Sequence, residues 1–323
     1  MSLTKDDWPI AASLLSLGPG RLDGASSDRE EWLRSLTTVR DAEFDLVDLT
    51  DSWLPYGDLR TGQRKDLREA LSEADLGAVS LSAIRRSVID EVSGDENLAY
   101  SHRTLDFAAE LGVGVVSVGL HRPLTEEQRS QLWFWTAQGH RDVIDDEDVW
   151  RLAVDRFREL GRHAEEVGVL LSLELYEHTL LGSARSAVRL VESIGLDVVG
   201  LNPDVGNLIR LHEPVEDWRT VMSATLPYAN FWHVKNYTRD ENATNGTVTT
   251  APSYLESGII DYRESVALAV ASGFQGVICT EHYGGDGLSM SAANRDYLRR
   301  RVLPRRPGPV GTSRVRQQFG EAR

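Results

Sequence analysis

Short apolar segments alternate with amphipathic segments along almost the whole chain, and this alternation most constrains the fold. In residues 28–40, for example, Trp32, Leu33, Leu36 and Val39 recur with the period of a helix, after a predicted N-cap at Ser26 or Ser27. Alternating strands and helices are typical of βαβ units and a parallel sheet. We expect strands at residues 11–17, 44–49, 76–81, 113–120, 170–174, 197–202, 230–234 and 275–281. Helices are expected at residues 28–40, 63–74, 97–111, 147–167, 184–194, 215–226, 261–272 and 289–303.

Eight strands and eight helices predict an α/β fold, a single (β/α)8 TIM barrel over residues 1–304, followed by a basic C-terminal tail over residues 305–323. Two insertions interrupt the rhythm, at residues 121–146 after the fourth strand and 237–258 after the seventh. The first contains Trp133, Phe134 and Trp135, and adjacent aromatic residues argue against disorder. It could pack on the barrel rim, contact another subunit or close over a substrate. We favour the lid, which makes Trp133 and Trp135 candidate substrate-binding residues.

The charge is strongly acidic, with a net value of −15 over 323 residues. From Arg295 onward nine arginines face only Asp296 and Glu321, a balance of 9 − 2 = +7, so the preceding residues carry −22. An acidic body repels phosphate backbones, which argues against a nucleic-acid enzyme. The basic end is expected to be solvated, and docking on an acidic subunit is the alternative.

The hydropathy and the cysteine count indicate the cellular compartment. No apolar window is long enough for a membrane span, and Cys279, the single cysteine, excludes an internal disulfide. We expect a cytoplasmic protein without a membrane contact, in which Cys279 is a small core residue and His102 and His163 lie on helix surfaces.

Four predicted strands end in residues that can bind a metal. Glu174 closes the fifth strand, Asp204 follows the sixth, His233 closes the seventh and Glu281 closes the eighth. Active sites of such barrels lie at the C-terminal ends of the strands. Taken singly, each residue could be an ion-pair partner, a turn residue, a core histidine or a helix cap. Together, three carboxylates cannot converge without a cation. Oxygen ligands with one imidazole favour one divalent ion, Mn²⁺ first, with Mg²⁺ or Co²⁺ as alternatives.

The segments around these residues resemble the xylose-isomerase-like barrel superfamily, in particular its sugar phosphate isomerase/epimerase branch. The similar segments are Leu173-Glu174, Asn202-Pro203-Asp204-Val205-Gly206-Asn207, His233-Val234-Lys235-Asn236 and Thr280-Glu281-His282-Tyr283-Gly284. The resemblance implies that Glu174, Asp204, His233 and Glu281 bind one divalent metal. It also implies that Arg239, six residues after His233, contacts the substrate.

Two residues depart from the pattern of that family. Asn207 stands where many members have a histidine beside the substrate carbonyl, and Asn236 replaces an aspartate. An asparagine can bind a substrate by hydrogen bonds but cannot exchange a proton near pH 7. We therefore place Asn207 among the substrate-binding residues and name His178 as a candidate for the missing imidazole, with a solvated loop histidine as the alternative.

The expected chemistry is proton abstraction next to the carbonyl of a sugar, through an enediolate, which gives epimerisation or isomerisation. Glu174 and Glu281 would serve as the acid–base pair. Lys235 would stabilise the negative charge on the enolate oxygen, unless it is part of a structural ion pair.

The alternative function is that of the α subunit of a C-glycoside deglycosidase, a carbon–carbon lyase that cleaves 3-oxo-C-glycosides by β-elimination and works with a small β subunit. The expected partners are therefore a carbohydrate or glycoside substrate and either further copies of the chain or that β subunit. A dehydratase acting on a cyclic keto acid, a metal endonuclease and a non-catalytic sugar-binding barrel are further readings.

Overall fold

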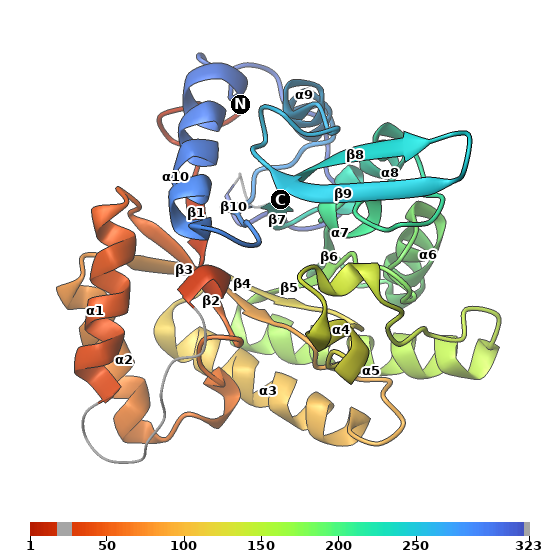
Figure 1. The fold of residues 1–323 in the computed structure, drawn as a ribbon. Helices are drawn as coiled ribbons and strands as arrows, with labels where there is room; N and C mark the ends of the chain where they lie inside the picture. The colour runs from red at the N-terminus through yellow and green to blue at the C-terminus, as the bar shows by residue number, and fades with distance from the viewer. Residues whose placement is uncertain (18–27, 320–323) are drawn as a thin grey trace.

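The computed structural model describes residues 1–17 and 28–319, and in them eight parallel strands form a nearly closed barrel (Figure 1). The hydrogen-bonded order is β6-β5-β4-β3-β2-β1-β10-β7, and the isolated bridge between Leu201 and Ala229 joins the two ends. The strands are β1 Ile10–Ser13, β2 Leu46–Thr50, β3 Gly77–Ala83, β4 Val115–Val118, β5 Leu170–Glu174, β6 Val199–Asn202, β7 Trp232–Val234 and β10 Ile278–Thr280. The predicted (β/α)8 barrel is therefore confirmed.

Helices surround this sheet on its outer side (Figure 1). They are α1 Asp28–Asp41, α2 Thr61–Glu73, α3 Gly94–Leu111, α5 Glu147–Val167, α6 Ala184–Ile194, α8 Trp218–Thr225, α9 Tyr262–Ala271 and α10 Gly287–Tyr297, which continues as a π-helix Leu298–Val302. The ends of α5 follow local rules: Asp146 accepts bonds from the first free amides, and Gly168 takes a φ of 76° after the last turn. The N-cap predicted at Ser26 or Ser27 lies outside the described residues. Within the described ranges, no helix combines the length and apolarity needed to cross a bilayer.

The first strand is shorter than predicted. Residues 14–17 form a 3-10 helix, Leu14–Leu17, directly after β1. Apolar residues alone did not separate this turn from the strand, because Leu14 is buried in the same core as Ile10. The 3-10 helix brings Leu15 to the C-terminal mouth of the barrel, where Leu15 lines the hollow described below.

The C-terminal segment binds the opposite end of the barrel, up to residue 319. Backbone amides of Arg314, Arg316 and Phe319 donate to the carbonyls of Pro227, Asp197 and Gln275, over 2.9, 2.8 and 3.1 Å. These acceptors all precede strands, so the segment crosses the N-terminal openings of the sheet. Phe319 packs against an interior cluster of Ala11, Val115, Phe231, Val277 and Cys279. Residues 314–319 are therefore held against the barrel by their backbone, whereas the side chains of Arg314 and Arg316 are 63% and 46% exposed, as expected of a solvated basic end. Cys279 is a buried core residue as predicted.

Both insertions lie at the C-terminal mouth and contact each other. The first contains α4 Glu126–Ser130 and a 3-10 helix Phe134–Thr136. The second is an antiparallel hairpin of β8 Asn236–Asn242 and β9 Thr247–Ser253, which the sequence did not predict. The indole nitrogen of Trp135 donates to Oγ1 of Thr250 on β9, over 3.1 Å. The two insertions thus cover one side of the mouth together.

Candidate metal centre and active site

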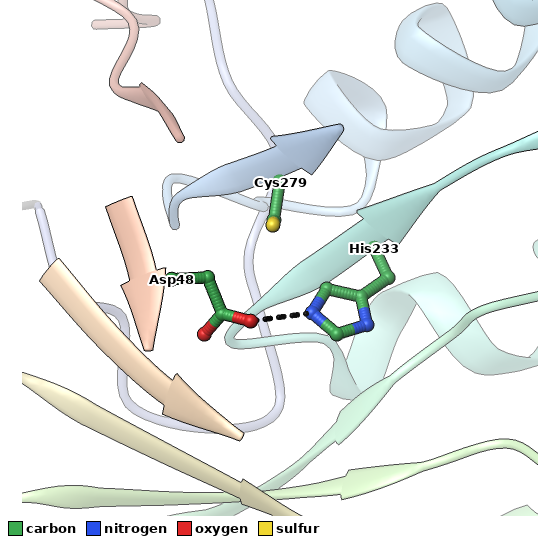
Figure 2. Close-up of side chains that lie close together, drawn as sticks. All are labelled: Asp48, His233 and Cys279. Carbon is green, nitrogen blue, oxygen red and sulfur yellow. Dashed lines mark hydrogen bonds and ion pairs between the residues drawn. The ribbon is translucent and has the colours of Figure 1, made fainter. Parts of the chain in front are cut away.

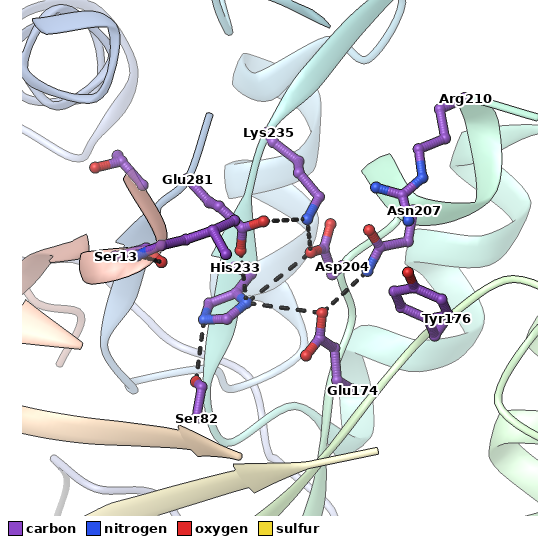
Figure 3. A network of polar contacts seen from close by, with 12 residues as sticks. Ser13, Ser82, Glu174, Tyr176, Asp204, Asn207, Arg210, His233, Lys235 and Glu281 are labelled. Atoms are coloured by element: carbon purple, nitrogen blue, oxygen red, sulfur yellow. Dashed lines mark hydrogen bonds and ion pairs between the residues drawn. The ribbon is translucent and has the colours of Figure 1, made fainter. Parts of the chain in front are cut away.

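The four predicted metal ligands converge at the C-terminal mouth of the barrel (Figure 3). Nδ1 of His233 lies 3.9 Å from Oε1 of Glu174, 3.9 Å from Oδ2 of Asp204 and 3.3 Å from Oε2 of Glu281. The register of the sheet places them there, since Cys279 on β10 pairs with His233 on β7 and the amide of Glu281 donates to the carbonyl of Val234. All four residues are buried.

The unpaired atoms of this cluster fit a cation. Among the described residues, Oδ1 of Asp204 and Nδ1 of His233 are buried and have no hydrogen-bond partner. Ligand atoms of Glu174, Asp204 and His233 lie within 4.8 Å of one another. Burial raises the pKa of Asp204 to about 7, because a carboxylate in this acidic, water-poor place is costly to ionise without a positive charge. Three carboxylates and one imidazole form an oxygen-rich donor set that suits Mg²⁺, Mn²⁺ or Co²⁺.

Asp48 on β2 orients the imidazole of His233 from the other side (Figure 2). Its Oδ2 lies 3.3 Å from Nε2 of His233, and its Oδ1 accepts a bond from Oγ of Ser82, over 3.0 Å. A proton on Nε2 leaves the lone pair of Nδ1 directed at the carboxylates, the arrangement that metal-binding histidines use. The sequence analysis missed Asp48, although a carboxylate between Val47 and Leu49 in a buried strand was a usable signal.

Cys279 completes a second possible ligand group with Asp48 and His233 (Figure 2). Burial raises the pKa of the Cys279 thiol to about 12, and only a thiolate binds a metal well. In addition, Asp48 faces the nitrogen of His233 that points away from the other carboxylates. The cluster around Nδ1 of His233 is therefore the better candidate for the metal centre.

Lys235 is an ion-pair partner of two of the ligands. Its Nζ lies 2.7 Å from Oδ2 of Asp204 and 2.7 Å from Oε1 of Glu281. Burial opposes the charge on the amine, but the carboxylates of Asp204 and Glu281 outweigh it and hold the pKa of Lys235 well above its usual value. Lys235 therefore places a positive charge beside these carboxylates, which fits both the predicted charge-stabilising role and the alternative of a structural ion pair.

Asn207 and Arg210 follow Asp204 on the short helix α7 Gly206–Ile209 and at its end. Nδ2 of Asn207 donates to Oε1 of Glu174 and to the carbonyl of Leu175, both over 3.0 Å.

The guanidinium of Arg210 is fully buried, and its Nη2 donates to both carboxylate oxygens of Glu177, over 2.7 and 2.8 Å. It also lies over four aromatic rings, those of Phe134, Trp135, Tyr176 and Tyr283. The sequence analysis missed this pair, whose members are 33 residues apart.

A small hollow opens beside the metal cluster. Its lining includes Glu174, His233 and Glu281, together with Leu15, Thr50, Ile84, Arg85, His121, Tyr176 and Tyr283. His121 stacks on Tyr176 at 4.2 Å, and burial lowers its pKa to about 3, so the ring is neutral at neutral pH. Arg85 has a φ of 57°, which is uncommon for a residue with a side chain, and its guanidinium donates to the hydroxyl of Tyr176 over 3.1 Å. Neither residue was predicted from the sequence.

The other predicted site residues lie outside this hollow. Nε2 of His178 lies 2.9 Å from Oε1 of Glu213, and His178 lines a neighbouring hollow instead. The guanidinium of Arg239 donates to the carbonyls of Ile209, Leu211 and Glu213 and so holds the loop after α7. Trp135 is buried between the insertions, and Trp133 stacks on it at 5.2 Å. The structure thus brings Asn207 and Lys235 to the metal ligands but not His178, Arg239, Trp133 or Trp135.

Comparisons with known proteins agree with this fold. A structure of a xylose isomerase-like TIM barrel protein from Mycobacterium smegmatis in complex with magnesium is 40% identical, with a TM-score of 0.86 over 92% of this chain and 97% of that chain. The L-ribulose-5-phosphate 3-epimerase UlaE of Salmonella heidelberg (strain SL476) is 21% identical over 84% of this chain and 90% of its own length. D-psicose 3-epimerase of Clostridium cellulolyticum H10 shares the fold, with 15% identity and a TM-score of 0.64 over 92% of this chain and 99% of that chain.

The family model described as xylose isomerase-like TIM barrel matches residues 36–301. The match spans most of the chain and includes the residues that converge on His233. The relatives include sugar epimerases, and the barrel contains a buried site that suits a divalent metal. The chain therefore belongs to the xylose isomerase-like TIM barrel family, as the residues at its strand ends predict.

Proposed function

We propose that the protein is a divalent-metal-dependent sugar isomerase or epimerase that moves a proton at the carbon next to a carbonyl group. One observation carries the proposal: Nδ1 of His233 lies between two carboxylates from different strands, Glu174 at 3.9 Å and Glu281 at 3.3 Å. Because Glu174 ends β5 and Glu281 follows β10, the two carboxylates approach the centre from different sides of the mouth. A substrate bound between them would present one face to each carboxylate, which is what inversion of a carbon centre requires.

The metal would be held by Glu174, Asp204, His233 and Glu281. A divalent ion there supplies positive charge that stabilises negative charge developing on substrate oxygens and so acidifies the neighbouring C–H. We propose Mn²⁺ as the working ion, with Mg²⁺ and Co²⁺ as alternatives, and the 40%-identical relative is in complex with magnesium. The contact of Asp48 with Nε2 of His233 would orient the ring so that Nδ1 faces this ion.

Residues of the chain supply the remaining steps. Glu174 or Glu281 would accept the carbon-bound proton, and either could return it. The ammonium of Lys235 donates to Oε1 of Glu281 over 2.7 Å and so places a positive charge beside this proposed base. His121 has a buried Nδ1 without a hydrogen-bond partner among the described residues, and as a neutral ring it could bind a sugar hydroxyl in the hollow.

The two insertions would close the site. Phe134 meets the ring of Tyr283 at 5.7 Å, and Tyr283 lines the hollow beside the metal cluster. This contact links the first insertion to the mouth of the barrel, as a lid over the substrate would be linked. The substrate-binding roles of Trp133, Trp135, Arg239 and His178 remain proposals that would require this lid region to rearrange when substrate binds.

Deuterium exchange tests the proposed chemistry. A panel of ketoses and their phosphate esters is incubated in D2O with the enzyme loaded with Mn²⁺, and deuterium at the carbon next to the carbonyl is measured by NMR. We expect exchange for at least one sugar, its loss with EDTA, and a loss of 100-fold or more in Glu174→Gln and Glu281→Gln. The exposed Glu192→Gln is the matched control and should exchange at the wild-type rate. If no sugar of the panel exchanges with the metal-loaded protein, the proposal fails.

The C-glycoside deglycosidase reaction is the second candidate, and one observation favours it. The hollow at the metal cluster and the neighbouring hollow share Arg85, His121 and Tyr176, which would give a second ring a place next to the reacting sugar. Such an enzyme would need a small β subunit. A 3-oxo-C-glucoside incubated with the protein, with and without that subunit, distinguishes the candidates. Release of the aglycone favours the lyase, and its absence in both incubations excludes it.

A further inference from the structure

Two histidines meet on the outer surface of the barrel, between neighbouring helices. His102 lies on α3 and His163 lies on α5, and their Nδ1 atoms are 2.8 Å apart. The ring centres are 4.9 Å apart, and the side chains are 26% and 21% exposed, so the pair is within reach of solvent. The proposed sugar chemistry uses neither residue, and the sequence analysis placed both on helix surfaces without a joint role.

A carboxylate holds the other nitrogen of each ring. Nε2 of His102 lies 3.0 Å from Oε1 of Glu159 on α5, and Nε2 of His163 lies 2.9 Å from Oδ1 of Asp106 on α3. Each helix therefore supplies one imidazole and the carboxylate that orients the imidazole of the other helix. A carboxylate accepts, so the proton of each neutral ring is on Nε2. Both Nδ1 lone pairs then face each other, which is unfavourable unless a positive centre lies between them.

The chemistry of these atoms selects the kind of centre. Imidazoles whose other nitrogen donates to a carboxylate are the usual histidine ligands of metal ions. Two nitrogens, each about 2.0–2.1 Å from a metal ion, lie roughly 2.9 Å apart at the right angle of a square-planar site and roughly 3.4 Å apart at the tetrahedral angle of Zn²⁺. The spacing of 2.8 Å seen here is closer to the square-planar value that Cu²⁺ and Ni²⁺ adopt. Nitrogen ligands favour Zn²⁺, Ni²⁺ and Cu²⁺ over the Mg²⁺ or Mn²⁺ that suits the oxygen-rich centre at the barrel mouth.

The surroundings leave room for the remaining ligands. An open hollow beside the pair is lined by Asp155, Glu159 and Glu166 and also by Arg158 and Arg162. The guanidinium of Arg158 is engaged, because it donates to the carbonyls of Ser193 and Ile194. Water or a carboxylate from this hollow could fill the open coordination positions of a bound ion.

We propose that His102 and His163 form a second metal site, specific for a borderline transition-metal ion such as Zn²⁺, Ni²⁺ or Cu²⁺, which bridges α3 and α5. The site is independent of the metal centre at the barrel mouth. The competing occupant is a single proton shared by the two rings, which would need no metal.

The test counts ions and identifies their ligands. Equilibrium dialysis against Zn²⁺, with the metal content measured by mass spectrometry, should give one equivalent more for the wild-type protein than for His102→Ala or His163→Ala. Glu159→Gln and Asp106→Asn should keep the site with a 10- to 100-fold weaker affinity. His140→Ala, which removes an exposed imidazole elsewhere, is the matched control and should keep the wild-type count.

Two readouts separate this site from the barrel mouth. Cu²⁺ bound to the pair should show an EPR spectrum with two imidazole nitrogens, whereas the four residues proposed to hold the metal at the mouth include one imidazole, that of His233. Zn²⁺ should also raise the unfolding temperature of the wild type, preloaded with Mn²⁺, and this rise should vanish in His102→Ala. Equal zinc counts in the wild type and both alanine variants, or a one-nitrogen Cu²⁺ spectrum, would overturn the proposal and leave the shared proton.

Discussion

The side-chain amide of Asn207 donates a hydrogen bond to Oε1 of Glu174 over 3.0 Å. The same nitrogen binds the carbonyl of Leu175, so the carboxylate of Glu174 is held against the end of its own strand. Asn207 stands where related proteins carry a histidine in the resemblance described above. In this chain it therefore orients a metal ligand and proposed base through a donor that carries no titrating proton.

Substitution of Asn207 should separate orientation from charge. We expect Asn207→Ala to lower kcat/KM by about 10- to 100-fold, the usual effect of losing a contact that orients a metal ligand. Asn207→Asp should be worse, because it places a like charge beside Glu174 and leaves the carboxylates competing for the same cation. Steady-state kinetics at saturating Mn²⁺ on the sugar found by deuterium exchange measures both. Equal rates for the wild type and Asn207→Ala would contradict the orienting role.

Asp48 should act through His233 in the same way. Asp48→Ala removes the acceptor at Nε2 of His233, so we expect Mn²⁺ affinity to fall by about 10- to 100-fold, as measured by calorimetric titration. Ser82→Ala is the graded control. Oγ of Ser82 donates to Asp48 over 3.0 Å and lies at the longer distance of 3.5 Å from Nε2 of His233, so its loss should weaken binding less. A larger loss in Ser82→Ala than in Asp48→Ala would contradict this order.

Position along the chain was enough to predict that the four candidate ligands converge, because the C-terminal ends of parallel strands meet at one rim whatever the loops do. Glu174, Asp204, His233 and Glu281 each end or follow a strand, and that is a local property. Asp48 lies within a strand, and its partner His233 is 185 residues away, so the contact depends on which residues face inward across the barrel. The ion pair of Arg210 and Glu177 likewise depends on tertiary packing, because the aromatic rings around Arg210 come from distant parts of the chain.

The two insertions also form contacts that the sequence could not predict. The aromatic composition of residues 121–146 indicated that this insertion is ordered, and the structure agrees. Composition could not predict that Trp135 would donate a hydrogen bond to Thr250, 115 residues later. Arg239 was assigned to the substrate by its spacing from His233. The hairpin that carries it directs its guanidinium to the carbonyls of the loop after α7 instead. The spacing from His233 predicts only that Arg239 lies near the barrel mouth. The direction of its side chain depends on the hairpin, which the sequence did not predict.

Lys235 should compete with the metal for the carboxylates of Asp204 and Glu281. Its ammonium lies 2.7 Å from both Asp204 and Glu281, so removal of the charge by Lys235→Met should leave these carboxylates more dependent on a cation. We expect the metal-free variant to have a lower unfolding temperature than the wild type, and a larger rise on addition of Mn²⁺. Differential scanning calorimetry with and without EDTA measures both values. An equal Mn²⁺-induced rise in the two proteins would show that Lys235 does not offset the ligand charge.

The buried pair of Arg210 and Glu177 should dominate the stability of the mouth. Glu177→Gln leaves a fully buried guanidinium without its counter-charge, and such a change costs about 3–5 kcal/mol of unfolding free energy. Arg219→Ala is the matched control, because Arg219 and Glu264 form an ion pair with side chains 53% and 40% exposed. Exposed pairs contribute about 0–1 kcal/mol. Urea unfolding measures both variants, and similar losses in the two would contradict the role of burial.

Asp51 should make stability depend on pH. It follows β2 and accepts a bond from the amide of Ile84 over 2.7 Å, and burial raises its pKa to about 6 from 3.8. The folded state therefore binds a proton that the unfolded state releases between these values, so stability increases as the pH falls through 6 toward 4. From pH 7.5 to 5 the wild type should gain about 1 kcal/mol relative to Asp51→Asn, which has no proton to bind. Urea unfolding in EDTA at each pH gives this difference. Asp142, whose pKa burial also raises to about 6, should give the wild type a gain of the same sign relative to Asp142→Asn. A difference between wild type and Asp51→Asn that stays constant or decreases as the pH falls would contradict the raised pKa of Asp51, because the folded protein would then hold no extra proton there.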